Sequence, residues 1–316
     1  MTSKDNRTLF GDSGDTTLHY ETDYRWYYCA NDNRHIYGEK IMAYKTLPDI
    51  DVNEIIKPAS KSDRSDRRTY LITGKTGVGK TFSFSTIPAK GLYLDFDGKA
   101  AYLQQPQFDD FIDIVNLKFD VNEHQSQQAK VEALYQLKTV KELSKKYSFL
   151  GIDGLTNLYA LGCQASHDAG LCTTRFKMNF DKMSFVDDWI WKRLMRWGAY
   201  FKNVILYCHE DVRSDILGGY NILPLCRSAL SLSMAKNFQE VWHARATGTE
   251  DDVEFSWSTK PEESCSNNTA IPNLPTRIPN NFSFVLETDW NKPGSLKDKI
   301  TAWEKTSGKK ITKFTP

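Results

Sequence analysis

Residues 74–81 limit what this chain can fold into more than any other feature. They follow the pattern G-x-x-x-x-G-K-[ST], and a short β-branched and aromatic segment, residues 69–73, precedes them. A strand that leads through such a loop into a helix places successive backbone N–H groups around the phosphates of a nucleotide. The sequence therefore predicts a nucleoside triphosphate site made by Gly74, Lys75, Thr76, Gly77, Val78, Gly79, Lys80 and Thr81.

Two side chains of this loop have predicted chemical roles. Lys80 is placed to reach the β- and γ-phosphate oxygens, and the Thr81 hydroxyl is placed to take one coordination position of Mg²⁺. A helix is expected over residues 82–87, because Pro88 cannot continue it. The motif leaves Lys75 free, so this residue either reaches a phosphate across a subunit interface or is exposed.

The composition is that of a globular protein and limits its partners. The 316 residues are 40% hydrophobic and 13% aromatic, with a formal net charge of +1. A charge near zero gives no general attraction to polyanions, so any nucleic-acid surface has to be local. No run reaches the eighteen or so apolar residues of a membrane span, and the first seven residues lack the apolar core of a signal peptide. We expect a cytoplasmic protein without a membrane partner.

The six cysteines are scattered without C-x-x-C spacing, which favours reduced thiols. Cys163, His167 and Cys172 are close in sequence, but they lack a fourth ligand at a suitable spacing. Incidental use is favoured over zinc, and Mg²⁺ is the only metal predicted.

Strand and helix patterns alternate through the middle of the chain. Strands are expected at residues 91–98, 111–117, 147–154 and 203–208, with helices at 126–146 and 180–202. Residues 162–179 and 211–221 lack clear periodicity and are expected to form mobile loops. The alternation predicts an α/β fold with a doubly wound, mostly parallel sheet. Residues 238–246 and 253–258 predict a C-terminal antiparallel extension.

Three of these strands end in ionisable side chains. The carboxyl ends of parallel strands face the ligand crevice, so Asp97, Asp153 and His209 are candidate site residues. Asp153 is placed to hold the Mg²⁺ water shell. Two alternatives stay open: Asp97 is also suited to cap a following helix, and His209 to a structural hydrogen bond.

The predicted domains are an irregular N-terminal arm over residues 1–38, a core over 39–259, and a C-terminal linker and basic extension over 260–316. The arm has an aromatic cluster at 24–28 that can stack on bases, dock on a neighbouring subunit or pack on its own domain. From Lys292 onward there are seven lysines and two acids. Such a basic end either binds phosphates or is solvated.

Four segments together, residues 74–81, 95–98, 152–156 and 204–210, resemble the RecA-like ATPases of bacteriophages, the AAA-type phage nucleotide-binding proteins. The resemblance covers about residues 39–300 and includes Leu223-Pro224-Leu225 before a helix and the strand at 238–243. It implies a RecA-like P-loop NTPase fold, ATP and Mg²⁺ as cofactors, and an oligomeric ring or filament. Some members of this family are single-strand annealing recombinases.

The same resemblance implies residue roles. Lys80 and Mg²⁺ neutralise phosphate charge, Asp97 orients the attacking water where RecA-like enzymes have a glutamate, Asp153 is the magnesium-associated acid, and His209 senses the γ-phosphate. A neighbouring subunit usually supplies an arginine or lysine, and Arg213, Arg227 and Arg245 are all open candidates.

Two functions follow as hypotheses. In the first, ATP orders an oligomer that holds single-stranded DNA, with the loops at 162–179 and 211–221 facing it. In the second, binding of the triphosphate controls binding of a protein partner without DNA. Asp97 favours this hypothesis, because it is one methylene shorter than the glutamate it replaces and such a change is expected to slow hydrolysis. A small-molecule kinase ranks last, because the sequence shows no arginine-rich lid.

Overall fold

The computed structural model describes residues 67–120, 122–168, 170, 180–214, 220–226, 228–249, 252–262, 265–311 and 314, with the backbone alone described at a few of them. The N-terminal arm with its aromatic cluster, the charged connector up to residue 66, and residues 171–179 and 215–219 of the two predicted loops lie outside the described residues, as does Cys172. Within the described ranges, no helix combines the length and the apolar content needed to cross a membrane.

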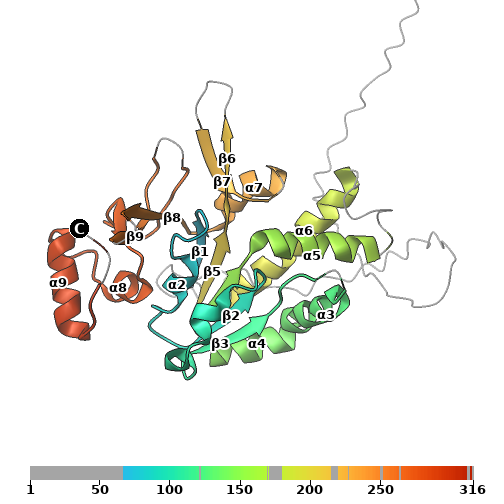
Figure 1. Ribbon diagram of the computed structural model, residues 1–316, viewed down its shortest axis with the longest axis horizontal. Coiled ribbons are helices and arrows are strands. Elements are labelled where there is room, and N and C mark those ends of the chain that lie inside the picture. The colour runs from blue at the N-terminus through green and yellow to red at the C-terminus, as the bar shows by residue number, and fades with distance from the viewer. Residues whose placement is uncertain are drawn as a thin grey trace, which may run out of the picture. The chain divides into compact units, whose positions relative to one another are not determined.

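An eight-stranded sheet organises the described part of the chain, in the order β10-β9-β8-β1-β5-β4-β2-β3 (Figure 1). The six strands from β8 to β3 are parallel to their neighbours, whereas β9 and β10 are antiparallel. The strands are β1 (Arg68–Thr73), β2 (Gly91–Asp95), β3 (Ile112–Asn116), β4 (Phe149–Asp153), β5 (Asn203–Cys208), β8 (Glu240–Gly248), β9 (Val253–Ser258) and β10 (Arg277–Pro279).

Both faces of the sheet are covered, because successive side chains of a strand point to opposite sides. Leu71 belongs to the apolar cluster on one face, and its neighbours Tyr70 and Ile72 to the cluster on the other. The first face packs against α3 (His124–Tyr135), α4 (Leu137–Lys146), α5 (Leu155–Asp168), α6 (Phe180–Tyr200) and α7 (Ser228–Met234). The second packs against α2 (Lys80–Phe84), η2 (Ala100–Gln104), α8 (Phe282–Glu287) and α9 (Leu296–Ser307). The predicted fold class, a doubly wound and mostly parallel α/β sheet with a C-terminal antiparallel extension, is confirmed.

Two helical predictions need correction. The single helix expected at 126–146 is divided into α3 and α4 at Gln136, whose backbone is extended. Residues 162–168 of the expected loop are helical instead, because α5 continues to Asp168. Gly162 lets α5 approach α6 closely, since an added Cβ would lie 3.0 Å from Val186. A helix whose contact face uses small residues shows weak hydrophobic periodicity, which explains the error.

The segment expected to form a mobile loop at 211–221 contains two paired strands instead. Strands β6 (Glu210–Ser214) and β7 (Tyr220–Pro224) form a separate antiparallel sheet, which extends beyond the end of β5 (Figure 1). All five residues of β6 are partly or fully exposed. A strand with little buried apolar surface has no clear period-two pattern, so sequence periodicity could not predict it.

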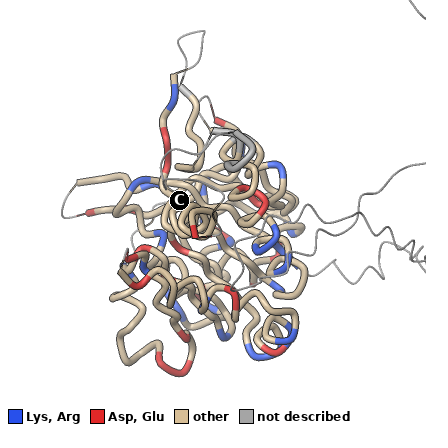
Figure 2. Tube along the Cα trace, turned by 90° about the vertical axis from the view of Figure 1, so that its right-hand side faces the viewer, with Lys and Arg blue, Asp and Glu red and all other residues tan. Residues whose placement is uncertain are grey.

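The C-terminal residues contribute to the core. Ile271, Leu274 and Ile278 are buried within the stretch expected to be a linker, and Trp303 of α9 packs in the same cluster. Along the described trace, Lys and Arg are interspersed with Asp and Glu on the side that Figure 2 presents.

Candidate nucleotide-binding site

The glycine-rich loop begins where β1 ends, at the carboxyl edge of the parallel strands. An added Cβ on Gly74 would lie 2.7 Å from the carbonyl oxygen of Ala244 on the neighbouring β8, so no larger residue fits there. Gly77 and Gly79 have φ values of +83° and +79°. Only glycine adopts this left-handed conformation without strain, so the loop can turn its backbone inward at these two positions.

Lys80 lies buried beneath the loop. Its Nζ donates hydrogen bonds to the carbonyl oxygens of Gly74 at 2.7 Å and Lys75 at 2.6 Å. Burial lowers the pKa of Lys80, and the nearby Asp153 carboxylate opposes this shift. The ammonium group is therefore held by groups of the loop itself, at the position from which phosphate oxygens would accept its hydrogen bonds.

The side chains of Thr81 and Asp153 contact each other at the carboxyl edge of the sheet. The Thr81 hydroxyl donates to Asp153 Oδ2 at 3.0 Å, and the buried Tyr93 hydroxyl donates to the same oxygen. Burial raises the pKa of Asp153, and the charge of Asp97 acts in the same direction. A hydroxyl beside a carboxylate is the hard oxygen pair that Mg²⁺ prefers, so the residues present fit this ion.

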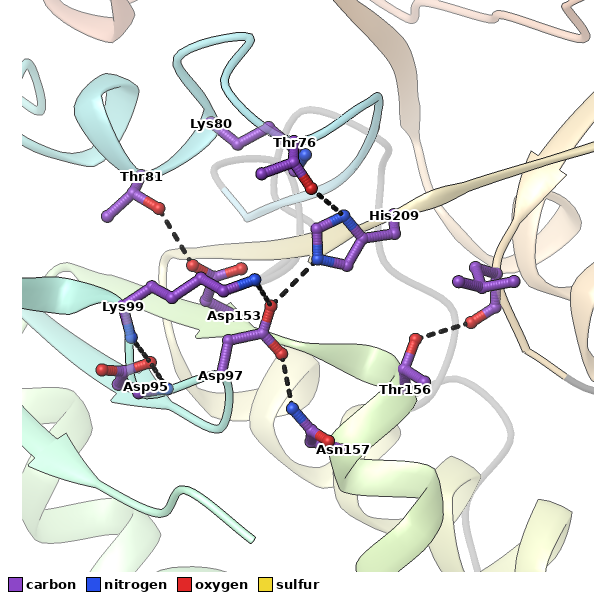
Figure 3. Close-up of polar contacts among 12 residues, drawn as sticks. Thr76, Lys80, Thr81, Asp95, Asp97, Lys99, Asp153, Thr156, Asn157 and His209 are labelled. Carbon is purple, nitrogen blue, oxygen red and sulfur yellow. Dashed lines mark hydrogen bonds and ion pairs between the residues drawn. The ribbon is translucent and has the colours of Figure 1, made fainter.

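Asp97 is surrounded by three polar partners (Figure 3). His209 Nε2 lies 3.0 Å from Asp97 Oδ2, Asn157 Nδ2 donates to Oδ1 at 2.8 Å, and Lys99 Nζ lies 3.7 Å from Oδ2. Burial alone would raise the pKa of Asp97, but these partners, His209 first, outweigh it and hold the pKa below its usual value. Asp97 is thus kept as a carboxylate with both oxygens engaged.

The backbone at Gly154 makes room for this carboxylate. Gly154 has a φ of +99°, and an added Cβ would lie 2.2 Å from Asp97 Oδ1. The position of Asp97 therefore depends on a glycine at the end of β4.

The capping role that the sequence left open for Asp97 belongs to Asp95. Its carboxylate accepts the backbone N–H groups of Gly98, Lys99 and Ala100 at 2.7, 3.2 and 3.0 Å. This arrangement fixes the turn after β2 and leaves the Asp97 side chain available to the cavity.

His209 connects Asp97 to the glycine-rich loop. Its Nδ1 lies 3.5 Å from the Thr76 hydroxyl, while Nε2 contacts Asp97. Thr81 and His209 thereby approach the Asp97 and Asp153 pair from opposite sides (Figure 3).

The predicted side chains converge on one cavity of about 250 Å³. Lys75 is exposed and Val78 is buried in the core. Of the arginines considered for a trans-acting role, Arg213 pairs with Asp211 and Arg245 with Glu262, and Arg227 lies outside the described residues. The lining residues are Thr76, Gly77, Gly79, Lys80, Thr81, Phe82, Asp97, Lys99, Asp153, His209 and Phe255.

Sequence reasoning missed several residues that shape this site. Asn157 and Lys99 hold Asp97, and Asn280 Nδ2 donates to the carbonyl oxygen of Gly79 at 3.0 Å. Phe82 and Phe255 form part of the cavity wall. Phe82 directly follows Thr81, so its place beside the loop could have been predicted from the sequence. No local motif marks Asn280 or Phe255, because only the fold brings them to the loop.

Comparison with known proteins gives the family. Residues 66–267, more than half of the chain, match the AAA domain family, and the chain belongs to this family. No curated protein sequence matches. Among solved structures, the chain is similar to a KaiC-like protein of the hyperthermophilic archaeon Pyrococcus horikoshii OT3. The identity is 12% and the TM-score 0.37, over 67% of this chain and 84% of that one.

Proposed function

We propose that this protein binds Mg²⁺ and ATP in the cavity at the carboxyl edge of the sheet and hydrolyses the bond to the γ-phosphate. One observation carries the proposal: Lys80, Thr81, Asp97, Asp153 and His209, which come from four separate segments, all line a single cavity. The AAA domain family and the P-loop fold support a nucleotide-dependent activity.

Lys80 supplies positive charge to the phosphates. Its ammonium group exchanges the carbonyl oxygens of Gly74 and Lys75 for β- and γ-phosphate oxygens when the triphosphate binds. The inward-turned backbone N–H groups of the loop bind the same oxygens. A lowered pKa makes the free lysine easier to deprotonate, and phosphate charge reverses that tendency.

Thr81 and Asp153 would hold a bound Mg²⁺. The ion would supply positive charge that stabilises the negative charge of the phosphates. Burial and the charge of Asp97 raise the pKa of Asp153, so a cation bound beside it would stabilise its charged form.

Asp97 orients the attacking water. Its two oxygens accept hydrogen bonds from His209 and Asn157, and a carboxylate oxygen can accept a second hydrogen bond, here from the attacking water. His209 is the partner that also reaches Thr76 on the loop, where the γ-phosphate would lie. We assign His209 the role of sensing the γ-phosphate, because it contacts both Asp97 and Thr76.

Two variants test the chemistry. Lys80→Ala removes the ammonium group and should abolish retention of ATP in equilibrium binding. Asp97→Asn should keep ATP binding and lose turnover, because the amide orients water poorly. Retained turnover in the Asp97→Asn protein would remove Asp97 from the mechanism, and undiminished ATP binding by Lys80→Ala would refute the site.

We further propose that the protein acts as a homo-oligomer, a ring or filament, on single-stranded DNA in phage recombination, annealing or replication. The resemblance of its motifs to RecA-like phage ATPases supports this proposal. The test is the ATPase rate with and without single-stranded DNA at several salt concentrations, with the particle mass measured in parallel. No stimulation and no salt-dependent binding would refute the DNA role.

A nucleotide-dependent switch that binds a protein partner is the second candidate. The observation that favours it is that the short Asp97 side chain, which already has three polar partners, has limited freedom to reach a water, and this predicts slow hydrolysis. This function predicts ATP-dependent complex formation that is undiminished when DNA is removed.

A further inference from the structure

The cavity has an aromatic side that the proposed chemistry does not use. Phe82 directly follows Thr81 and lines the cavity, and the residue remains 36% exposed. Phe255 of β9 lines the same cavity and packs against the loop, since an added Cβ on Gly79 would lie 3.1 Å from its ring. Large aromatic side chains are usually buried, so an exposed one beside a ligand cavity needs an explanation.

The direction of the triphosphate places the nucleoside on this side. Asp97 and His209 mark where the γ-phosphate must lie, because the water that attacks it has to meet Asp97. Thr81 lies on the side of Asp97 and Asp153 opposite to His209 (Figure 3). The α-phosphate and the nucleoside therefore leave the loop past the residue that follows Thr81.

The two rings have a spacing suited to a flat partner. Their centroids are 6.5 Å apart and their planes are inclined by 32°. A planar ring between two others needs about 7 Å, two contacts of about 3.5 Å each. If the two rings moved slightly further apart, a base would fit between them. Phe82 also contacts Tyr102, with ring centroids 5.5 Å apart, and this neighbour limits its movement.

We propose that Phe82 and Phe255 form the base-binding subsite, in which the nucleobase of the bound triphosphate stacks on Phe82 with Phe255 as the opposite wall. This inference rests on the proposed function, because it assigns the remainder of the same ligand. Stacking uses the π-face that every base has, so the subsite contributes affinity without relying on hydrogen bonds to one base.

The test compares ATP with inorganic tripolyphosphate, which has the phosphates and no base. Dissociation constants for both ligands with Mg²⁺ are measured by titration calorimetry for the wild type, Phe82→Ala and Phe82→Leu. Leucine keeps most of the volume but removes the aromatic face, so it serves if the alanine variant fails to fold. Met195→Ala is the matched control, because Met195 is exposed and lines a separate cavity with Thr69 and Val204, at the opposite edge of the sheet.

Base stacking is worth about 1–3 kcal/mol, so both Phe82 variants should bind ATP roughly 5- to 150-fold more weakly, with tripolyphosphate binding unchanged. Met195→Ala should bind both ligands like the wild type. Equal affinity of the Phe82 variants and the wild type for ATP would overturn the inference, as would an equal loss for both ligands. If the wild type binds neither ATP nor tripolyphosphate, the proposed function itself fails.

Discussion

Replacing Gly154 with alanine tests how closely the backbone of β4 sets the position of Asp97. The added Cβ would lie 2.2 Å from Asp97 Oδ1, whereas ordinary contacts begin at 3.4 Å, so the oxygen has to retreat by about 1.2 Å (3.4 − 2.2). That movement breaks the hydrogen bond from Asn157, which is 2.8 Å long. A misplacement of about 1 Å can cost a catalytic step roughly 100-fold, and we expect a loss of kcat of that size.

Stability should fall at the same time. A non-glycine residue forced to a φ of +99° costs about 1–3 kcal/mol, which corresponds to a decrease in Tm of about 2–12 °C for a chain of this size. The affinity for ATP should change little, because Lys80 and the glycine-rich loop do not contact Gly154. Steady-state ATPase assays, calorimetric titration with ATP and thermal unfolding measure the three quantities.

Gly308→Ala is the matched control for backbone strain. Gly308 has a φ of +69°, and nothing lies within 4 Å of its added Cβ, so this variant should lose stability without losing kcat. A folded Gly154→Ala protein whose kcat is within about threefold of the wild type would refute the reasoning, because Asp97 would then not need its position.

Three further outcomes are expected. Burial raises the pKa of Asp153 in the folded protein. The folded protein therefore loses stability as the pH rises from the ordinary carboxyl range through that raised pKa, because the buried side chain then becomes charged. Asp153→Asn should therefore gain more Tm at pH 8 than at pH 4 while losing Mg²⁺-dependent ATP binding; a lower Tm at pH 8 would contradict this. His209→Gln removes the main group that lowers the pKa of Asp97, so the acid limb of the pH profile of kcat should move to higher pH, and an unmoved limb would exclude this coupling. Asn280→Ala deletes the hydrogen bond to the Gly79 carbonyl oxygen, which should cost about 1 kcal/mol in thermal unfolding and raise the Kd for ATP, whereas an unchanged Kd would show that this contact does not support the loop.

The strands around the site were predictable because they are short, apolar and bounded by clear signals. The strand predicted at residues 69–73 became Arg68–Thr73, and Asn203–Cys208 was predicted without error. The elements that were predicted incorrectly from the sequence lack such signals. Helix α5 uses small residues where it meets α6, and the β6 and β7 pair buries too little apolar surface to show alternation.

The site residues also fall into those that local sequence signals predicted and those that they did not. The glycine-rich loop is contiguous in sequence and its chemistry is fixed by residue type, so it could be identified without coordinates. The ends of β2, β4 and β5 indicated Asp97, Asp153 and His209 as candidates, because parallel strands end at one edge. Which acid caps the turn after β2 was not decided by the sequence, since both Asp95 and Asp97 have the right side chain for that role.

The sequence by itself determined that this chain has a phosphate-binding loop on a parallel sheet, because that information is local: residue type, spacing and strand periodicity. The tertiary structure alone decided that Asn157 and His209 engage Asp97, that Asn280 holds the loop and that Phe255 faces Phe82. These contacts join residues 60 to 201 positions apart. No local pattern records such pairs, because they exist only after the sheet has brought its strands together.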